Sequence, residues 1–184
     1  MLTLYIILGV LALLVLYVIL AYNGLVRLVQ QAREAESDID VQLKRRFDLI
    51  PNLMETVKGY MAHERETLES VTKARTQFMA AKTPQEQLAA DNFLSNTLKT
   101  LFAVSENYPD LKANANFLDL QRELADTENK IQAARRFYNA NVRDLNIRVE
   151  QFPTNRIAGV FGFRPMEFFD VEAPGERQPV KVGF

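Results

Sequence analysis

The chain opens with a long apolar run that contains no charged side chain. From Leu2 to Ala21 only Thr3 and Gly9 depart from apolar side chains, and the first charged residue is Arg27. Twenty helical residues extend about 30 Å, which is the thickness of a bilayer's hydrocarbon core. A signal peptide would have a basic segment before a shorter run and a small-residue cleavage motif after it. The run therefore predicts a transmembrane anchor over residues 1–22.

Beyond the anchor, apolar residues recur every three or four positions from Leu25 to Val149. This spacing is typical of amphipathic helices, and no stretch alternates as a strand would. Helix breakers divide the region 23–152 into four helices joined by short connections, so consecutive helices should be antiparallel neighbours. The sequence predicts an all-α fold: an N-terminal transmembrane helix continues into an up-and-down antiparallel bundle of long helices, with an irregular C-terminal tail.

The breakers predict where the helices begin and end. Asp48 as an N-cap would place Pro51 in the first turn of a new helix, after a turn near residues 46–48 reverses the chain. The alternative is one continuous helix that is kinked at Pro51. Thr83, followed by a proline and then Glu86, predicts a capping box, and Pro109 ends the third helix.

Residues 153–184 differ from the bundle in composition, since they are richer in proline, glycine and phenylalanine. Residues 153–161 are compatible with one short helix, and the last fifteen residues, with Pro174, Gly175 and Pro179, predict a loose tail. Because the fourth helix of such a bundle returns toward the anchor, the aromatic side chains after it should lie near the membrane. They either cover the end of the bundle or form an interaction surface; they are Phe161, Phe163, Phe168 and Phe169.

Composition excludes several kinds of function. There are 22 basic and 23 acidic residues, so no basic excess predicts nucleic-acid binding. The chain has no cysteine, and its one histidine, His63, cannot supply the two Glu-x-x-His pairs of a di-iron bundle. We expect His63 at the surface, and we expect no metal and no cofactor. Without a recognisable nucleophile, base or phosphate loop, the sequence predicts no enzyme.

Four charged residues fall on otherwise apolar helix faces: Glu64, Arg75, Glu128 and Arg135. Partly buried ion pairs between helices would fix their register, and this is the expected role. A catalytic carboxylate pair is the alternative. The basic cluster Lys44–Arg46 lies roughly 35 Å beyond the anchor in a straight helix, too far for lipid, and should pair with Asp40 and Asp48.

Basic residues near the anchor predict its orientation. Arg27 and Arg33 follow the apolar run closely, whereas no basic side chain precedes it. They are the expected contacts to lipid headgroups. The positive-inside rule then favours an N-terminus outside and a C-terminal domain in the cytoplasm.

Several strings, in order, resemble the LemA family. They are Ile39–Leu53 (IDVQLKRRFDLIPNL), Thr56–Tyr60 (TVKGY), Ala134–Arg136 and Phe161–Phe163. The resemblance implies a bacterial protein with one N-terminal membrane helix and a bundle of long helices in the cytoplasm or facing the envelope. That family includes a magnetosome-associated relative and members encoded beside membrane metalloproteases. No enzymatic activity is established for it.

Three hypotheses of function follow. The leading one is a single-pass protein of the bacterial inner membrane that acts as a non-enzymatic scaffold and forms a homo-oligomer through helix packing. The second is an adaptor or regulator of a membrane protease or envelope complex, and the third is an enzyme of unrecognised type. A pocket with convergent polar groups would favour an enzyme, whereas an exposed helix seam would favour the first two.

Overall fold

A computed structural model describes residues 1–169, with Pro84 and Gln85 described only in their backbone. Its six helices are α1 (Leu2–Lys58), α2 (Arg65–Ala80), α3 (Pro84–Ser105), α4 (Pro109–Lys112), α5 (Ala115–Glu150) and α6 (Thr154–Phe161). No strand occurs between residues 1 and 169, so the predicted all-α fold is confirmed. The chain forms two compact units, which divide within α1 and α5. Of the described residues, 1–36 and 135–169 make one, and residues 37–134 make the other.

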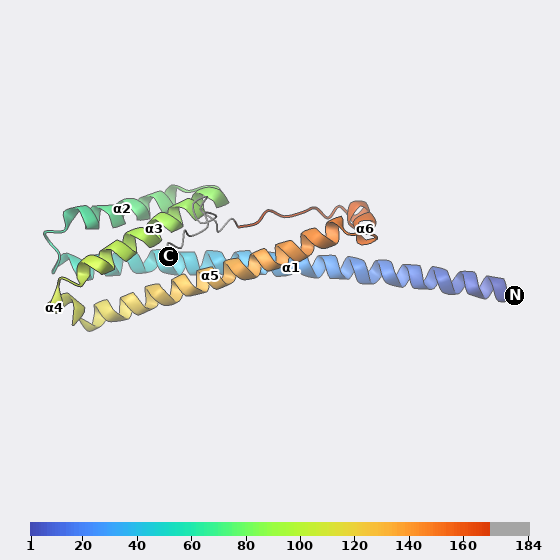
Figure 1. Ribbon diagram of the computed structural model, residues 1–184, viewed down its shortest axis with the longest axis horizontal. Coiled ribbons are helices and arrows are strands. Elements are labelled where there is room, and N and C mark those ends of the chain that lie inside the picture. Colours follow the sequence, from blue (N-terminus) through green and yellow to red (C-terminus); the bar gives the residue numbers. More distant parts are fainter. Residues whose placement is uncertain (170–184) are drawn as a thin grey trace, which may run out of the picture. The chain divides into compact units, whose positions relative to one another are not determined.

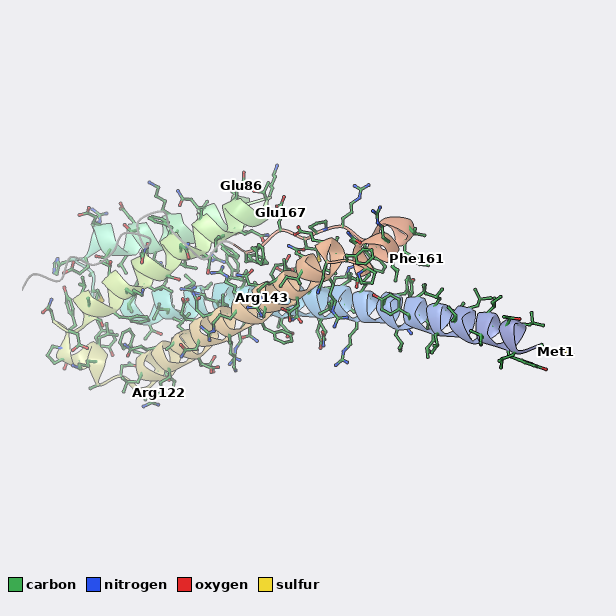
Figure 2. All side chains as sticks on the ribbon, turned by 45° about the vertical axis from the view of Figure 1, so that its right-hand side comes forward. Met1, Glu86, Arg122, Arg143, Phe161 and Glu167 are labelled. Atoms are coloured by element: carbon green, nitrogen blue, oxygen red, sulfur yellow. The ribbon has the colours of Figure 1, made fainter. Side chains whose placement is uncertain are left out.

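The first third of α1 is the candidate membrane span. Its apolar window has a mean hydropathy of 3.0, and only 6% of that window is buried against the rest of the protein. Figure 2 shows the side chains near Met1 projecting from all sides of the helix. A soluble protein's core helix would be covered by neighbours instead. This exposure, together with the length, matches the predicted anchor.

The predicted turn near Asp48 is wrong, because α1 runs through Pro51 to Lys58 without interruption (Figure 1). A proline inside a helix costs about 3 kcal/mol. Ile50, Leu53 and Val57 are fully buried on either side of it, and each contributes roughly 1.5–3 kcal/mol on burial. Their combined contribution exceeds the cost. Pro51 itself is exposed, so water can solvate the carbonyl that its missing N–H leaves unbonded.

The unit of residues 37–134 is a four-helix arrangement. The end of α1 and helices α2, α3 and α5 alternate in direction (Figure 1), as the up-and-down prediction requires. All of these helices contribute to one apolar core, which α4 extends with Leu111; its members include Ile50, Leu53, Val57, Val71, Leu94, Leu101, Phe117 and Leu124.

Polar caps define the connections of this unit. The predicted capping box before α3 is confirmed, because Thr83 Oγ1 accepts the Glu86 N–H while the Glu86 carboxylate accepts the Thr83 N–H. The backbone N–H groups of Lys82 and Thr83, which both donate to the Glu86 carboxylate, lower the pKa of Glu86. At the start of α5, Asn114 Oδ1 accepts the Phe117 N–H at 3.1 Å. Caps of this kind satisfy N–H groups that have no partner inside the helix.

The other unit contains the start of α1, the end of α5, the short helix α6 and the segment 162–169. The predicted short helix is present as α6. Its core joins Leu25, Leu145 and Ala158 from the three helices. Gly162, with φ of 75°, ends α6 in the left-handed conformation that glycine adopts at no steric cost. The predicted loose tail with Pro174, Gly175 and Pro179 lies outside the described residues.

Candidate functional site

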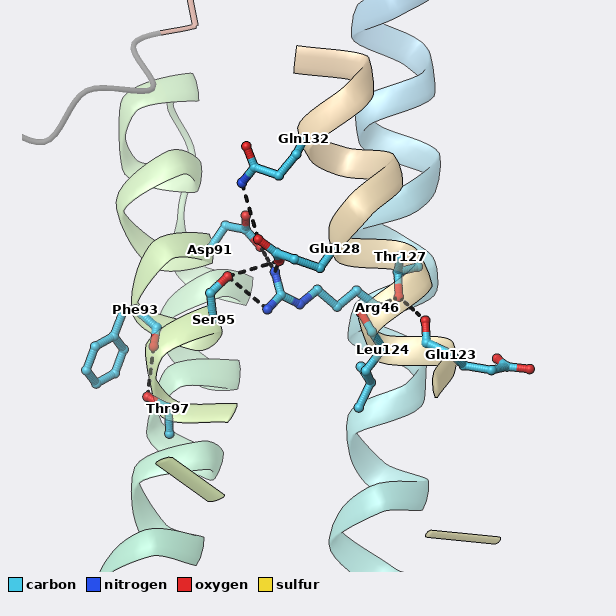
Figure 3. A network of polar contacts seen from close by, with 10 residues as sticks. All are labelled: Arg46, Asp91, Phe93, Ser95, Thr97, Glu123, Leu124, Thr127, Glu128 and Gln132. Carbon is cyan, nitrogen blue, oxygen red and sulfur yellow. Dashed lines mark hydrogen bonds and ion pairs between the residues drawn. The ribbon is translucent and has the colours of Figure 1, made fainter. Parts of the chain in front are cut away.

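A buried arginine on α1 joins three helices of the 37–134 unit. Arg46 Nη1 lies 2.8 Å from Asp91 Oδ1 and 2.7 Å from Glu128 Oε2, and Nη2 donates to Ser95 Oγ at 2.9 Å. Figure 3 shows these side chains converging from α1, α3 and α5. The Arg46 side chain is 3% exposed and that of Asp91 1% exposed. One guanidinium therefore neutralises carboxylates from two other helices.

The surroundings of Glu128 complete this network. Its two carboxylate oxygens accept further hydrogen bonds from Ser95 Oγ and Gln132 Nε2, each at 3.2 Å. Arg45, beside Arg46, instead forms an exposed ion pair with Glu123 at 3.5 Å. Both terminal nitrogens of Arg46 and both carboxylate oxygens of Glu128 thus have partners, whereas the buried Arg46 Nε has none.

The expectation that Arg46 would pair with Asp40 and Asp48 is wrong. Arg46 stands three residues after buried Leu43 and four before buried Ile50, so it lies on the apolar face of α1. Lys44 and Arg45 do not lie on this apolar face, and both are exposed. The sequence signal that could have placed Arg46 was its position on the apolar stripe.

Of the four predicted network residues, Glu128 lies in the Arg46 network, and Glu64 and Arg75 meet other partners. Glu64, which leads into α2, accepts a hydrogen bond from Tyr108 Oη at 2.8 Å. This bond raises the pKa of Tyr108 above its ordinary value, because ionisation of the phenol would place two negative charges together. A second hydrogen bond joins residues near these two in the sequence: Asn114 Nδ2 donates to Tyr60 Oη at 3.2 Å. Both contacts tie the segment after α1 to the segment around α4.

The two predicted arginines are both at least partly buried. Arg75 lies over the ring of Phe47, with 4.4 Å from its guanidinium carbon to the ring centroid, so an aromatic face replaces the expected carboxylate. Arg135 belongs to the other unit, where it is 1% exposed. Sequence periodicity identified both faces but not which partner each side chain would meet.

The chemistry available to the Arg46 network is limited. A cleft of about 230 Å³ opens beside it between Leu98, Phe102 and Leu124. Serine nucleophiles are activated by an adjacent base, whereas here both neighbouring carboxylates are ion-paired to Arg46. His63 is exposed in a turn, and within the described residues no group of three or more metal-ligating side chains gathers. The network is therefore best explained as an internal cross-link.

Aromatic side chains gather in the unit that carries the candidate span. The Tyr22 ring lies 4.8 Å from the Phe161 ring and 5.6 Å from the Phe163 ring, both in edge-to-face geometry. Tyr17 Oη is 3.4 Å from Thr154 Oγ1 at the start of α6. These contacts hold α6 against α1 at the end of its apolar run.

Two asparagines on α5 hold the extended segment after α6. Asn146 exchanges two hydrogen bonds with the Met166 backbone, both 2.9 Å, and Asn139 exchanges two with the Phe169 backbone at 2.8 and 2.9 Å. Seven residues of a helix and three residues of an extended chain both cover about 10 Å. The spacing of the two asparagines on α5 therefore matches the spacing of the two backbone positions that they bind. Sequence reasoning missed this clamp, although the seven-residue spacing of the asparagines was visible.

A buried tyrosine adjoins the clamp. Tyr138 Oη donates to the Glu167 carbonyl at 3.0 Å, and its ring meets the Phe169 ring edge to face. Burial, then the Glu36 and Glu167 carboxylates, raise the pKa of Tyr138. Phe169 is consequently packed against Tyr138.

The predicted aromatic patch is thus divided. Phe163 and Phe169 are half-buried against Tyr22 and Tyr138, whereas Phe161 and Phe168 are exposed. The predicted headgroup contacts Arg27 and Arg33 are also exposed. Whether these residues contact lipid or another protein stays a prediction.

Comparison with known families decides the relationship of the chain. The model of the LemA family matches residues 35–184, which include both the Arg46 network and the asparagine clamp. The chain belongs to the LemA family. The match begins after the apolar run, so it rests on the helices that form the body of this LemA-family protein and on the tail.

Curated relatives agree with this assignment. The magnetosome protein MamQ of Paramagnetospirillum magneticum is 24% identical, over 86% of this chain and 68% of its own length. The MamQ of Magnetospirillum gryphiswaldense is 23% identical with the same coverage. Protein LemA of Metamycoplasma hominis is 30% identical over 74% of this chain and 63% of its own length.

Proposed function

We propose that this LemA-family protein is a membrane-anchored, non-enzymatic scaffold that self-associates in the bacterial inner membrane. The observation that carries the proposal is the continuity of α1, which extends as one helix from an exposed apolar run into a packed helical unit. An uncovered apolar run of this length can hold the helical residues that follow it at a membrane. The Arg46 network, in which both carboxylates are ion-paired, supports a structural role.

The charge distribution supports a cytoplasmic body. Residues 1–36 and 135–169 contain eight arginines and five acidic residues, whereas residues 37–134 contain twelve basic and fifteen acidic residues. The unit that includes the candidate span is therefore the basic one. Basic residues beside a membrane helix favour the cytoplasmic side.

Two exposed apolar side chains on α5 support self-association. Phe137 and Ile147, ten residues apart in the unit that carries the anchor, are both about half exposed. They are separated by about 15 Å along the helix. An anchor confines copies to two dimensions and raises their effective concentration, so a modest surface of this kind suffices for association.

The test is the mass of the full-length protein in detergent and in lipid nanodiscs. We expect an oligomer, and we expect Phe137→Asn with Ile147→Asn to shift it toward the monomer. The matched control is Arg136→Asn with Arg143→Asn, which places two asparagines at exposed positions on the same side of α5 without removing an apolar side chain and should leave the mass unchanged.

A monomer in both media, or equal masses for the two double variants, would contradict the scaffold. Recovery from native membranes of a stoichiometric complex with a membrane protease, in place of a second copy, would establish the adaptor hypothesis instead.

A further inference from the structure

The position of α6 along α1 sets its depth in a bilayer. Tyr17, whose hydroxyl meets Thr154 at the start of α6, lies four residues before Ala21, where the apolar run ends. Four helical residues correspond to about 6 Å. Tyr22, whose ring meets Phe161 at the end of α6, lies just beyond the run. If residues 2–21 span the hydrocarbon core, the end of α6 lies at the boundary of the core. The start of α6 then lies about 6 Å inside it.

The outer surface of this region is strongly apolar. Phe152, Val160 and Phe161 are 74%, 81% and 52% exposed, whereas Ile157 and Ala158 face the unit's core. These exposed side chains continue the surface of α1, whose apolar run is itself uncovered. Contiguous exposed apolar surface marks a contact with another apolar phase.

Basic side chains accompany these apolar groups. Arg156, one helical turn before Val160, and Arg164, just after α6, are both exposed. Arginine can lay its alkyl stem along apolar surface while its guanidinium reaches a phosphate. Exposed Phe and Val with nearby arginines are typical of helices buried roughly 5–10 Å into the headgroup and acyl boundary, which agrees with the depth derived from Tyr17.

We propose that α6 and the residues flanking it form a second membrane-contacting element, which inserts Phe152, Val160 and Phe161 into the acyl boundary while Arg156 and Arg164 bind anionic lipid phosphates. The occupant is lipid rather than protein because α6 is held at the level of the bilayer by its contacts with Tyr17 and Tyr22. The inference rests on the proposed anchoring by α1. With two contacts, the bilayer would restrain rotation and tilt of the anchor as well as its depth.

The test uses spin labels on the full-length protein, which has no native cysteine to remove. Val160→Cys and Phe152→Cys report on α6 in vesicles of phosphatidylcholine and phosphatidylglycerol. Leu14→Cys, at a position 57% exposed in the candidate span, is the bilayer reference, and Val41→Cys, at a position 58% exposed in the other unit, is the water reference. Collisions of each label with oxygen and with a water-soluble nickel chelate are measured.

We expect the oxygen-to-nickel collision ratio at 152 and 160 to exceed that at 41 several-fold and to approach that at 14. Replacing Arg156 and Arg164 by glutamine should lower the ratio at 160 in phosphatidylglycerol vesicles and change it little in pure phosphatidylcholine. Circular dichroism verifies that each variant remains helical.

The outcomes separate the two proposals. Water-like ratios at 152 and 160 with a bilayer-like ratio at 14 overturn the inference about α6 alone. A water-like ratio at 14 overturns the anchoring and the inference with it. Labels at 160 that are shielded from both reagents, and that broaden as the labelled fraction rises, show a second protein copy on this surface and overturn the assignment to lipid.

Discussion

Replacement of Arg46 by methionine removes the cation that Asp91 and Glu128 share. Methionine keeps much of the apolar volume of the arginine stem, so the main loss is electrostatic. Because Arg46 and Asp91 are both almost fully buried, the change should cost about 3–5 kcal/mol of unfolding free energy, the usual effect of breaking one side of a buried ion pair.

A matched surface pair provides the control. Lys130 and Asp126 lie 2.8 Å apart on α5 at i, i+4 spacing, and each side chain is about half exposed. Lys130→Met removes the same charge with the same new side chain but should cost only about 0.3–0.5 kcal/mol. The difference between the two variants therefore measures burial rather than loss of a charge.

Urea unfolding of the full-length protein in detergent, followed by far-ultraviolet circular dichroism, provides the assay. With an m-value on the order of 2 kcal/mol/M, the midpoint of Arg46→Met should fall by roughly 2 M. If Arg46→Met is no more destabilising than Lys130→Met, the network does not contribute as the structure indicates.

Two further predictions concern α1 and Tyr138. Spin labels at Ser37 and Lys58 should lie about 32 Å apart, since 21 helical residues separate them. A much shorter distance would contradict the continuous helix and support a turn near Asp48. The phenol of Tyr138 should titrate above its ordinary pKa in an absorbance titration, with Tyr138→Phe as the spectral reference, and Glu36→Gln should lower that pKa. Because the folded-state pKa is the higher one, the associated stability is present below about pH 10 and is lost as the pH rises through the folded-state value; an unshifted titration would contradict the burial of this ring.

The region around Pro51 shows why local signals misplace a turn. Asp48 and Pro51 match the start of a helix, and the sequence alone offers no reason to ignore them. Burial decides the outcome, because the apolar stripe of α1 continues through Ile50, Leu53 and Val57. The free energy gained by burying that stripe depends on helices that lie much later in the sequence. At Thr83 the same kind of local signal was correct, because no buried stripe crosses that connection.

The Arg46 network shows the same limit for side chains. Periodicity places a residue on a face, but a face does not specify a partner. Arg46 meets Asp91 and Glu128, which lie 45 and 82 positions further along the chain, while Arg75 meets an aromatic ring instead of a carboxylate. Such pairings arise only when several helices are packed together.

The sequence by itself determined the features that depend on near neighbours in the chain. These are the apolar run, the helical periodicity, the capping box at Thr83 and the short helix after residue 153, since hydrophobic patterning and capping act within a few residues. Tertiary structure decided the passage of α1 through Pro51, the burial of Arg46, and the clamp of Asn139 and Asn146 that packs Phe169 while Phe161 stays exposed. Those outcomes depend on contacts between distant segments, whose free energy of burial outweighs local preference.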